Sequence, residues 1–230
     1  MAPFLSTLAY ASRAPPTPPP LTARNAVQKR YMQLLQAADP PIVLATGPAG
    51  CAKTFLCTSI GMRRLLDGGV KRLVITRPAV PADGEEHGFL PGTLEEKMDP
   101  WLRPIYDVMY RYATPAHVTA LIARRAIEVC PLAFMRGRTF DSCWIIADEM
   151  QNASPKQMLM LMTRIGRDSK LVITGDPQQH DRAGADCGLT DVLHRMAVAP
   201  SPAEGIEAVR FTAAHVERHP VVREVLNLYT

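Results

Sequence analysis

The sequence predicts an α/β fold, in which helices cover a parallel β-sheet. Short apolar segments rich in β-branched residues alternate along the chain with longer segments of helical periodicity. Buried strands of parallel sheets have this composition, and strands that alternate with helices form the right-handed crossovers of one sheet. A glycine-rich turn, residues 47–54, joins the first apolar segment to a helical one.

The elements follow in order from these patterns. Buried strands are predicted over residues 42–46, 72–76, 143–147, 170–174 and 207–211, with a further strand near residues 127–130. Helices are predicted over residues 22–38, 53–66, 115–125, 155–164, 188–198 and 213–228. A chain of 230 residues can bury a sizeable core, so we expect residues 21–230 to form a single domain.

Two segments depart from this alternation. Residues 1–20 end in a run of prolines, which favours extended polyproline conformation, and we expect a disordered arm. Residues 78–112 are expected to form an insertion over the active face of the domain. The internal prolines Pro100 and Pro104 should interrupt or kink its helical part, Leu94 to Arg111.

The composition excludes several classes of protein. The five cysteines lack the spacing of a zinc site, and we expect reduced thiols. No apolar run approaches the roughly 20 residues of a membrane helix, and the first residues lack the basic region of a secretion signal. We therefore expect a cytoplasmic protein with no membrane contact. The net charge of +4 is compatible with a nucleic-acid partner without demonstrating one.

The glycine-rich turn has the layout of a P-loop that binds a nucleoside triphosphate. Its backbone N–H groups would form an anion nest at the positive end of the following helix. Lys53 would reach the β- and γ-phosphates, and Thr54 would place a hydroxyl on Mg²⁺. The residues expected to contact the nucleotide are Gly47, Pro48, Ala49, Gly50, Cys51, Ala52, Lys53 and Thr54.

This loop has Ala52 where the P-loop consensus has glycine immediately before the lysine. Gly50 still supplies the position expected to need a positive φ, so the loop should form. The added methyl group of Ala52 would crowd the phosphates, and it would weaken nucleotide binding or slow turnover.

A second apolar strand ends in two adjacent acids, Asp148 and Glu149, which is the Walker B pattern. Parallel sheets bind ligands at the carboxyl ends of their strands. Asp148 would hold Mg²⁺, directly or through water, and Glu149 would polarise the attacking water. A strand end with solvated carboxylates is the alternative, and the preceding P-loop favours Walker B.

A third apolar strand, residues 171–174, runs into the polar turn Gly175-Asp176-Pro177-Gln178-Gln179. A glutamine at such a strand end can hydrogen-bond the γ-phosphate or the neighbouring water, and we assign this role to Gln179. The alternative is a simple Gly-Asp-Pro turn.

These residues resemble a known family. The Gly-Asp-Pro-x-Gln turn resembles motif III of superfamily 1 helicases. The longer blocks are similar to the PhoH family, and the resemblance runs from about Gln28 to the C-terminus. Those blocks lie at residues 76–80, 88–92, 96–107, 136–140, 148–153 and 216–220.

The resemblance implies a RecA-like P-loop ATPase core of the superfamily 1 type. Family members are cytoplasmic, are often hexameric and are linked to RNA metabolism. Short members occur in phages, so a bacterial or phage-infected cell is the expected location. Gln28 matches the glutamine that contacts adenine, which favours ATP. From the residues alone, a solvated helix position is the preferred interpretation of Gln28.

Phosphoryl transfer needs positive charge on the phosphates beyond Lys53 and Mg²⁺. We expect no second RecA-like domain after residue 179 to supply it, so either hydrolysis is feeble or an arginine comes from a neighbouring subunit. Arg138, Arg182 and Arg218 are candidates, and Arg218 ranks first because it lies in a family block.

The sequence thus predicts a Mg²⁺-dependent ATPase that forms a homo-oligomer, a hexamer by resemblance, and acts on RNA or single-stranded DNA. Helicase activity would be inherited from the resemblance only. A non-catalytic nucleotide-binding ring is the main alternative, and a small-molecule kinase is disfavoured. Basic residues available to a polynucleotide are Arg77, Lys97, Arg103, Arg111, Arg124, Arg125, Arg136 and Arg138.

Overall fold

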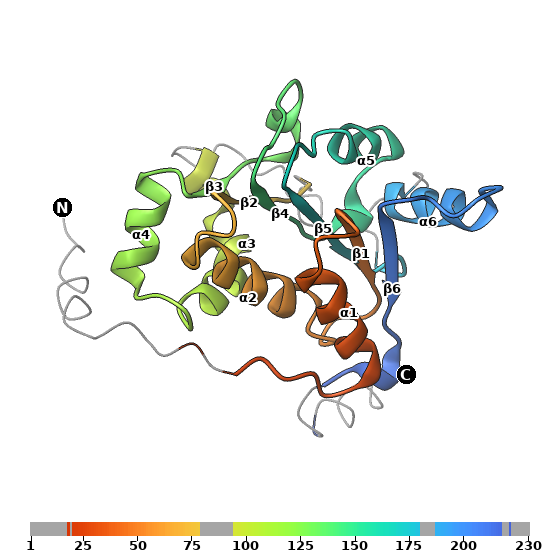
Figure 1. The fold of residues 1–230 in the computed structure, drawn as a ribbon, viewed down its shortest axis with the longest axis horizontal. Coiled ribbons are helices and arrows are strands. Elements are labelled where there is room, and N and C mark those ends of the chain that lie inside the picture. Colours follow the sequence, from red (N-terminus) through yellow and green to blue (C-terminus); the bar gives the residue numbers. More distant parts are fainter. Residues whose placement is uncertain (1–17, 19, 79–93, 180–186, 218–220, 222–230) are drawn as a thin grey trace.

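The computed structural model describes residues 18, 20–78, 94–179, 187–217 and 221. Its centre is a six-stranded sheet of order β3-β2-β4-β5-β1-β6, in which every pair of neighbours is parallel (Figure 1). This sheet confirms the predicted α/β fold. The strands are β1 Ile42–Thr46, β2 Arg72–Thr76, β3 Ile127–Val129, β4 Cys143–Ala147, β5 Lys170–Gly175 and β6 Ile206–Arg210.

Helices cover both faces of the sheet. They are α1 Ala26–Gln36, α2 Lys53–Leu66, α3 Leu94–Met109, α4 Pro115–Ala123, α5 Pro155–Met162 and α6 Gly188–Val198. Three short 3₁₀ turns are η1 Leu132–Met135, η2 Met150–Asn152 and η3 Ala213–His215. None of the helices in the described parts of the chain is long and apolar enough to cross a membrane.

The two faces of the sheet carry two separate hydrophobic cores. Alternate residues of β1 illustrate the division, because successive side chains of a strand point to opposite faces. Val43 and Ala45 belong to the core under α1 to α4, whereas Ile42 and Leu44 belong to the core under α5, α6 and η1. All four are buried, which explains why β1 is apolar up to its last residue, Thr46.

The order of the strands determines which loops meet. Strand β5 lies between β1 and β4, with Thr46 opposite Gly175 and Ala147 opposite Ile173. All three strands run in the same direction, so the segments that follow them emerge at one edge of the sheet. These segments are the glycine-rich loop, the acidic pair and the Gly-Asp-Pro turn.

Two predicted helices differ from the structure. Leu94–Met109 forms one continuous helix, α3, through Pro100 and Pro104. The unbroken helix contradicts the interruption that we expected at these prolines. The buried side chains of Leu102 and Ile105 pack it into the core, and this packing outweighs the hydrogen bonds that proline removes. Residues 1–17, 19 and 79–93 lie outside the described residues; they include most of the predicted arm and 15 of the 35 residues of the predicted insertion.

The helix predicted from residue 213 is wrong over residues 213–217. The turn η3 ends after His215, and Val216 is extended. The backbone N–H of Glu217 donates to the carbonyl of Gly50 at 3.1 Å, which ties this segment to the loop after β1. A hydrogen bond to a distant carbonyl therefore replaces the continuation of the helix. Residues 222–230 lie outside the described residues.

At the amino ends of the strands, a buried lysine joins α1 to the sheet. Lys170, at the start of β5, is 6% exposed. Its ammonium group donates to three carbonyl oxygens, those of Leu34, Ala37 and Pro40, at 2.7–2.9 Å. These carbonyls end α1 and lead into β1, so the lysine holds the helix in place before the strand.

We expect the Lys170→Met substitution to lower the free energy of unfolding by about 3 kcal/mol, because it leaves buried carbonyls without donors. Urea denaturation measures this loss. Lys71→Met is the matched control, since Lys71 is exposed and should change stability by no more than about 0.5 kcal/mol. Equal stability of the two variants would contradict a structural role for the Lys170 ammonium.

Candidate active site

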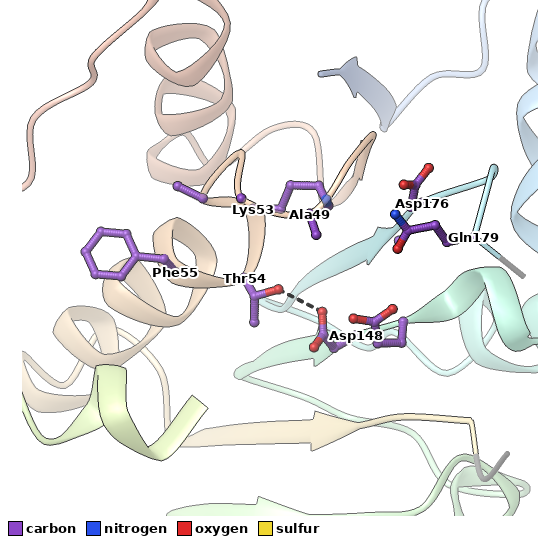
Figure 2. Close-up of a pocket in the computed structure, with 11 residues that line it drawn as sticks. Ala49, Lys53, Thr54, Phe55, Asp148, Asp176 and Gln179 are labelled. Atoms are coloured by element: carbon purple, nitrogen blue, oxygen red, sulfur yellow. Dashed lines mark hydrogen bonds between the residues drawn. The ribbon is translucent and has the colours of Figure 1, made fainter. Parts of the chain in front are cut away.

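Three loops surround one cavity of about 230 Å³ at the carboxyl edge of the sheet. The loop after β1 contributes Lys53 and Thr54, the segment after β4 contributes Asp148 and Glu149, and the turn after β5 contributes Gln179. Lys53 and Thr54 face Asp148 and Gln179 across the cavity (Figure 2). The structure thus brings together the five side chains predicted to contact phosphate, metal and water.

The rest of the glycine-rich loop divides into two groups. Ala49, Gly50 and Ala52 line the cavity, together with the neighbouring Phe55. Gly47, Pro48 and Cys51 do not line it: Cys51 is fully buried, and Gly47 and Pro48 turn their carbonyl oxygens to the lysine of the loop.

The backbone of this loop is left-handed at more than one position. Gly50 has a φ of 89°, as expected, but Ala52 also lies in the left-handed region, with φ 65° and ψ 22°. The missing consensus glycine therefore matters for backbone strain as well as for crowding. Gly47 is required for another reason, because a Cβ there would lie 2.3 Å from the carbonyl oxygen of Phe211.

Lys53 is the cation of the cavity. Its Nζ donates to the carbonyl oxygens of Gly47 and Pro48 in the same loop. Burial lowers the pKa of Lys53 from its ordinary value, and the nearby Cys51 and carboxylates oppose this shift. The ammonium is thus held by neutral acceptors, which anionic phosphate oxygens would outcompete.

Asp148 joins the loop to the sheet through two hydroxyl groups. Thr54 Oγ1 donates to Asp148 Oδ1 at 2.8 Å, and Thr174 Oγ1 of β5 donates to the same oxygen. A carboxylate and a hydroxyl oxygen therefore lie within contact distance at the cavity. Oxygen donors of this kind suit Mg²⁺. Among the described residues, no cluster of three or more His, Cys, Asp or Glu side chains offers a competing metal site.

Glu149 is held by two residues that the sequence analysis did not assign to this role. Gln151 Nε2 donates to Glu149 Oε2 at 2.5 Å, and Arg77 Nη2 lies 4.0 Å from Glu149 Oε1. The backbone of Glu149 is left-handed, with φ 55°. Arg77 follows β2, and β2 pairs with β4 so that Thr76 lies opposite Ala147. Once β2 and β4 are placed as neighbours, Arg77 is expected beside the acidic pair.

Gln28 lies outside the cavity lining. Its side chain is 2% exposed, so the alternative of a solvated helix position is wrong. The Oε1 atom accepts from the backbone N–H of Arg24, and Nε2 donates to Glu217 Oε1 at 3.2 Å. Because Glu217 also bonds to Gly50, the glutamine is connected to the glycine-rich loop through one intermediate residue.

The predicted arginines are distributed differently. Arg138 forms an ion pair with Glu128 at 2.6 Å and does not line the cavity of its own chain. Arg182 and Arg218 lie outside the described residues. Arg111 places its guanidinium 5.2 Å from the ring centre of Phe55, at the cavity rim. Other members of the basic set are exposed, namely Arg103, Arg124, Arg125 and Arg136. The side chain of Lys97 is not described.

The cysteines take no part in the chemistry of the cavity lining. All five are free thiols, and four are buried. Burial raises the pKa of Cys57 to about 12, so this thiol stays protonated at neutral pH. Cys51 donates to the carbonyl oxygen of Thr212 at 3.7 Å and helps to pack the loop against the segment after β6.

The sequence was compared with those of known protein families and curated proteins. Residues 20–230 match the family described as PhoH-like protein. The PhoH-like protein of Synechocystis is 40% identical over 207 residues, with coverage of 90% of this chain and 61% of the relative. That of Bacillus subtilis is 41% identical over 203 residues, with coverage of 88% and 61%. That of Mycobacterium tuberculosis is 43% identical over 206 residues, with coverage of 88% and 56%.

The chain therefore spans only about three fifths of the length of these curated relatives. Among solved structures, a match is the Pif1 helicase from Candida albicans, with a TM-score of 0.42 and 14% sequence identity. That match covers 90% of this chain and 44% of the helicase chain.

We expect Ala52→Gly to raise the free energy of unfolding by about 1 kcal/mol, because glycine adopts a left-handed conformation without the Cβ penalty. Thermal or urea denaturation measures the gain. Ala49→Gly is the matched control in the same loop: its φ is not positive, so it should leave stability unchanged or slightly lower. A destabilised Ala52→Gly variant would contradict the left-handed assignment.

Proposed function

This chain belongs to the PhoH family and has the fold and loop of a P-loop NTPase, and from that premise we propose that it binds ATP with Mg²⁺ and hydrolyses it. One observation carries the proposal. The hydroxyl of Thr54 and the carboxylate of Asp148 are hydrogen-bonded at 2.8 Å, beside Lys53, Glu149 and Gln179 in one cavity. Phosphate, metal and water ligands are thus available together.

The glycine-rich loop would bind the phosphates. Its backbone N–H groups and the positive end of α2 favour an anion there. Lys53 would exchange the carbonyl oxygens of Gly47 and Pro48 for phosphate oxygens. The anionic phosphates would also offset the effect of burial, which lowers the pKa of this lysine.

Thr54 and Asp148 are the residues that would hold Mg²⁺, directly or through water. An ion held by these two side chains would supply positive charge to offset the negative charge that develops on the phosphates.

Glu149 would accept a hydrogen bond from the attacking water, and Gln179 would contact that water or the γ-phosphate. Gln28 would recognise adenine, for which its amide must exchange the bonds to Arg24 and Glu217.

Two arginines would supply further positive charge at the phosphates. Arg77 belongs to the same chain and lies 4.0 Å from Glu149, which supports a role beside the water. An arginine from a neighbouring subunit is the second source, with Arg218 ranked before Arg182 and Arg138. The second source requires a homo-oligomer, which we propose to be a hexameric ring.

RNA or single-stranded DNA is the proposed partner of the ATPase. The exposed arginines 103, 124, 125 and 136 support a polynucleotide contact, because phosphate contacts dominate such binding. The strained Ala52 favours a second candidate function, a nucleotide-binding ring with little or no turnover. Whether phosphate is released separates the two.

The Lys53→Ala and Glu149→Gln substitutions should affect ATP binding and ATP turnover separately. We expect Lys53→Ala to weaken ATP binding about 100-fold or more, because it removes the charge-assisted contacts to phosphate. Glu149→Gln should keep ATP affinity and lower kcat about 100-fold, because an amide is a poor general base. Equilibrium titration and phosphate release measure the two effects. Unchanged affinity in Lys53→Ala would sink the phosphate-loop assignment.

Titration of RNA or single-stranded DNA into the ATPase reaction should stimulate turnover, with an affinity for the polynucleotide that falls steeply as salt is added.

Light scattering should give a mass near six times the 25.3 kDa of one chain. A monomer with full activity would rule out an arginine supplied by a neighbour. A ring that releases no phosphate, with or without polynucleotide, would favour the non-catalytic alternative.

A further inference from the structure

Gln151 occupies the space between the acidic pair and the turn after β5. Its side chain is 3% exposed, and both ends of its amide are used. Nε2 donates to Glu149 Oε2 at 2.5 Å, and Oε1 accepts from the backbone N–H of Asp176 at 3.2 Å. We infer that Gln151 is a positioning residue that orients Glu149 and couples it to Gln179; the inference rests on the proposed hydrolysis.

The local backbone explains how Gln151 reaches Glu149. Strand β4 ends at Ala147, Glu149 has a left-handed backbone, and the 3₁₀ turn η2 begins with the next residue. The N–H of Asn152 donates to the carbonyl of Glu149 at 3.2 Å, which closes this turn. A side chain two residues after Glu149 can therefore fold back onto its carboxylate. Strained backbone of this kind persists where surrounding contacts fix it.

The second half of the coupling runs through the turn after β5. Asp176, whose N–H is bound by Gln151, accepts from the N–H of Gln179 with its carbonyl oxygen at 3.0 Å. Its side chain accepts from the N–H of Gln178 at 3.1 Å. Three consecutive hydrogen bonds thus connect the carboxylate that would polarise water to the residue that would contact the γ-phosphate.

Gly175 leaves the space that this arrangement requires. A Cβ at residue 175 would lie 2.7 Å from Gln151 Oε1 and 3.1 Å from the backbone N of Gln151. Any larger residue would push the amide away from the Asp176 N–H. The last residue of β5 is therefore fitted to the Gln151 side chain, which is an independent sign that its position matters.

In the proposed hydrolysis, Gln151 would set the orientation of the Glu149 carboxylate. With Gln151 bound to Oε2, the carboxylate of Glu149 cannot rotate freely, and Oε1 stays on the side of Arg77. A general base must be aligned with the water it polarises, and small misplacements cost large factors in rate. Movement of the 175–179 turn toward a bound phosphate would shift the amide of Gln151 and, through it, the carboxylate of Glu149.

Gln151→Met tests the inference, because it keeps the length of the side chain and removes both hydrogen bonds. We expect kcat to fall about 10- to 100-fold while the dissociation constant for ATP changes less than about threefold. Gln157→Met is the matched control. Gln157 also accepts a backbone N–H, that of Ser154, in the cap of α5, but it does not line the cavity. This control should lose stability only.

The turnover of a double variant tests the coupling between Gln151 and Gln179. If Gln151 and Gln179 act as one unit, the double variant Gln151→Met/Gln179→Ala should be no more than about threefold slower than the slower single variant. Multiplied losses would overturn the coupling. Gly175→Ala should reproduce the loss of kcat at retained ATP affinity, and wild-type turnover in that variant would also count against the inference.

The outcomes separate the inference from the function on which it rests. A wild-type chain without phosphate release, alone or with polynucleotide, would overturn both. An active wild type with an equally active Gln151→Met variant would overturn the positioning role alone. Parallel losses of ATP affinity, kcat and stability in Gln151→Met would reduce Gln151 to a structural residue.

Discussion

The parallel register of β1, β5 and β4 is the constraint on which the site depends. Because β5 lies between the other two strands and all three end at the same edge, three segments far apart in the sequence meet around one cavity. Two hydroxyl groups, those of Thr54 and Thr174, converge on one oxygen of Asp148 and join the three strands at this point. A shift of one residue in the register of β5 would turn Thr174 to the other face.

The glycine-rich loop is also supported from behind by the last described segment of the chain. Gly47 lies against the backbone of Phe211, Cys51 contacts Thr212, and Glu217 bonds to Gly50. These contacts hold a loop that contains a left-handed alanine, a conformation that costs about 1–2 kcal/mol by itself. Residues near the end of the chain thus contribute directly to the shape of the loop and, through Glu217, to the position of Gln28.

The ionic groups of the cavity have hydrogen-bonding or ion-pair partners within the chain. Lys53 is held by carbonyl oxygens, Asp148 by hydroxyl groups, and Glu149 by the Gln151 amide and Arg77. Such contacts hold the side chains in one arrangement around the cavity, as the proposed hydrolysis would require.

The sequence by itself determined the strands, most helices, the glycine-rich loop and the acidic pair, because apolar periodicity and the turn at Gly47–Thr54 are local properties. It did not determine the conformation of Ala52, the non-helical path of residues 213–217, the burial of Gln28, or the contacts of Arg77 and Gln151 with Glu149. Each of these depends on contacts between residues distant in sequence, such as Glu217 with Gly50 and Gln151 with Asp176. Only the packed sheet brings those partners together, and so only the tertiary structure decided them.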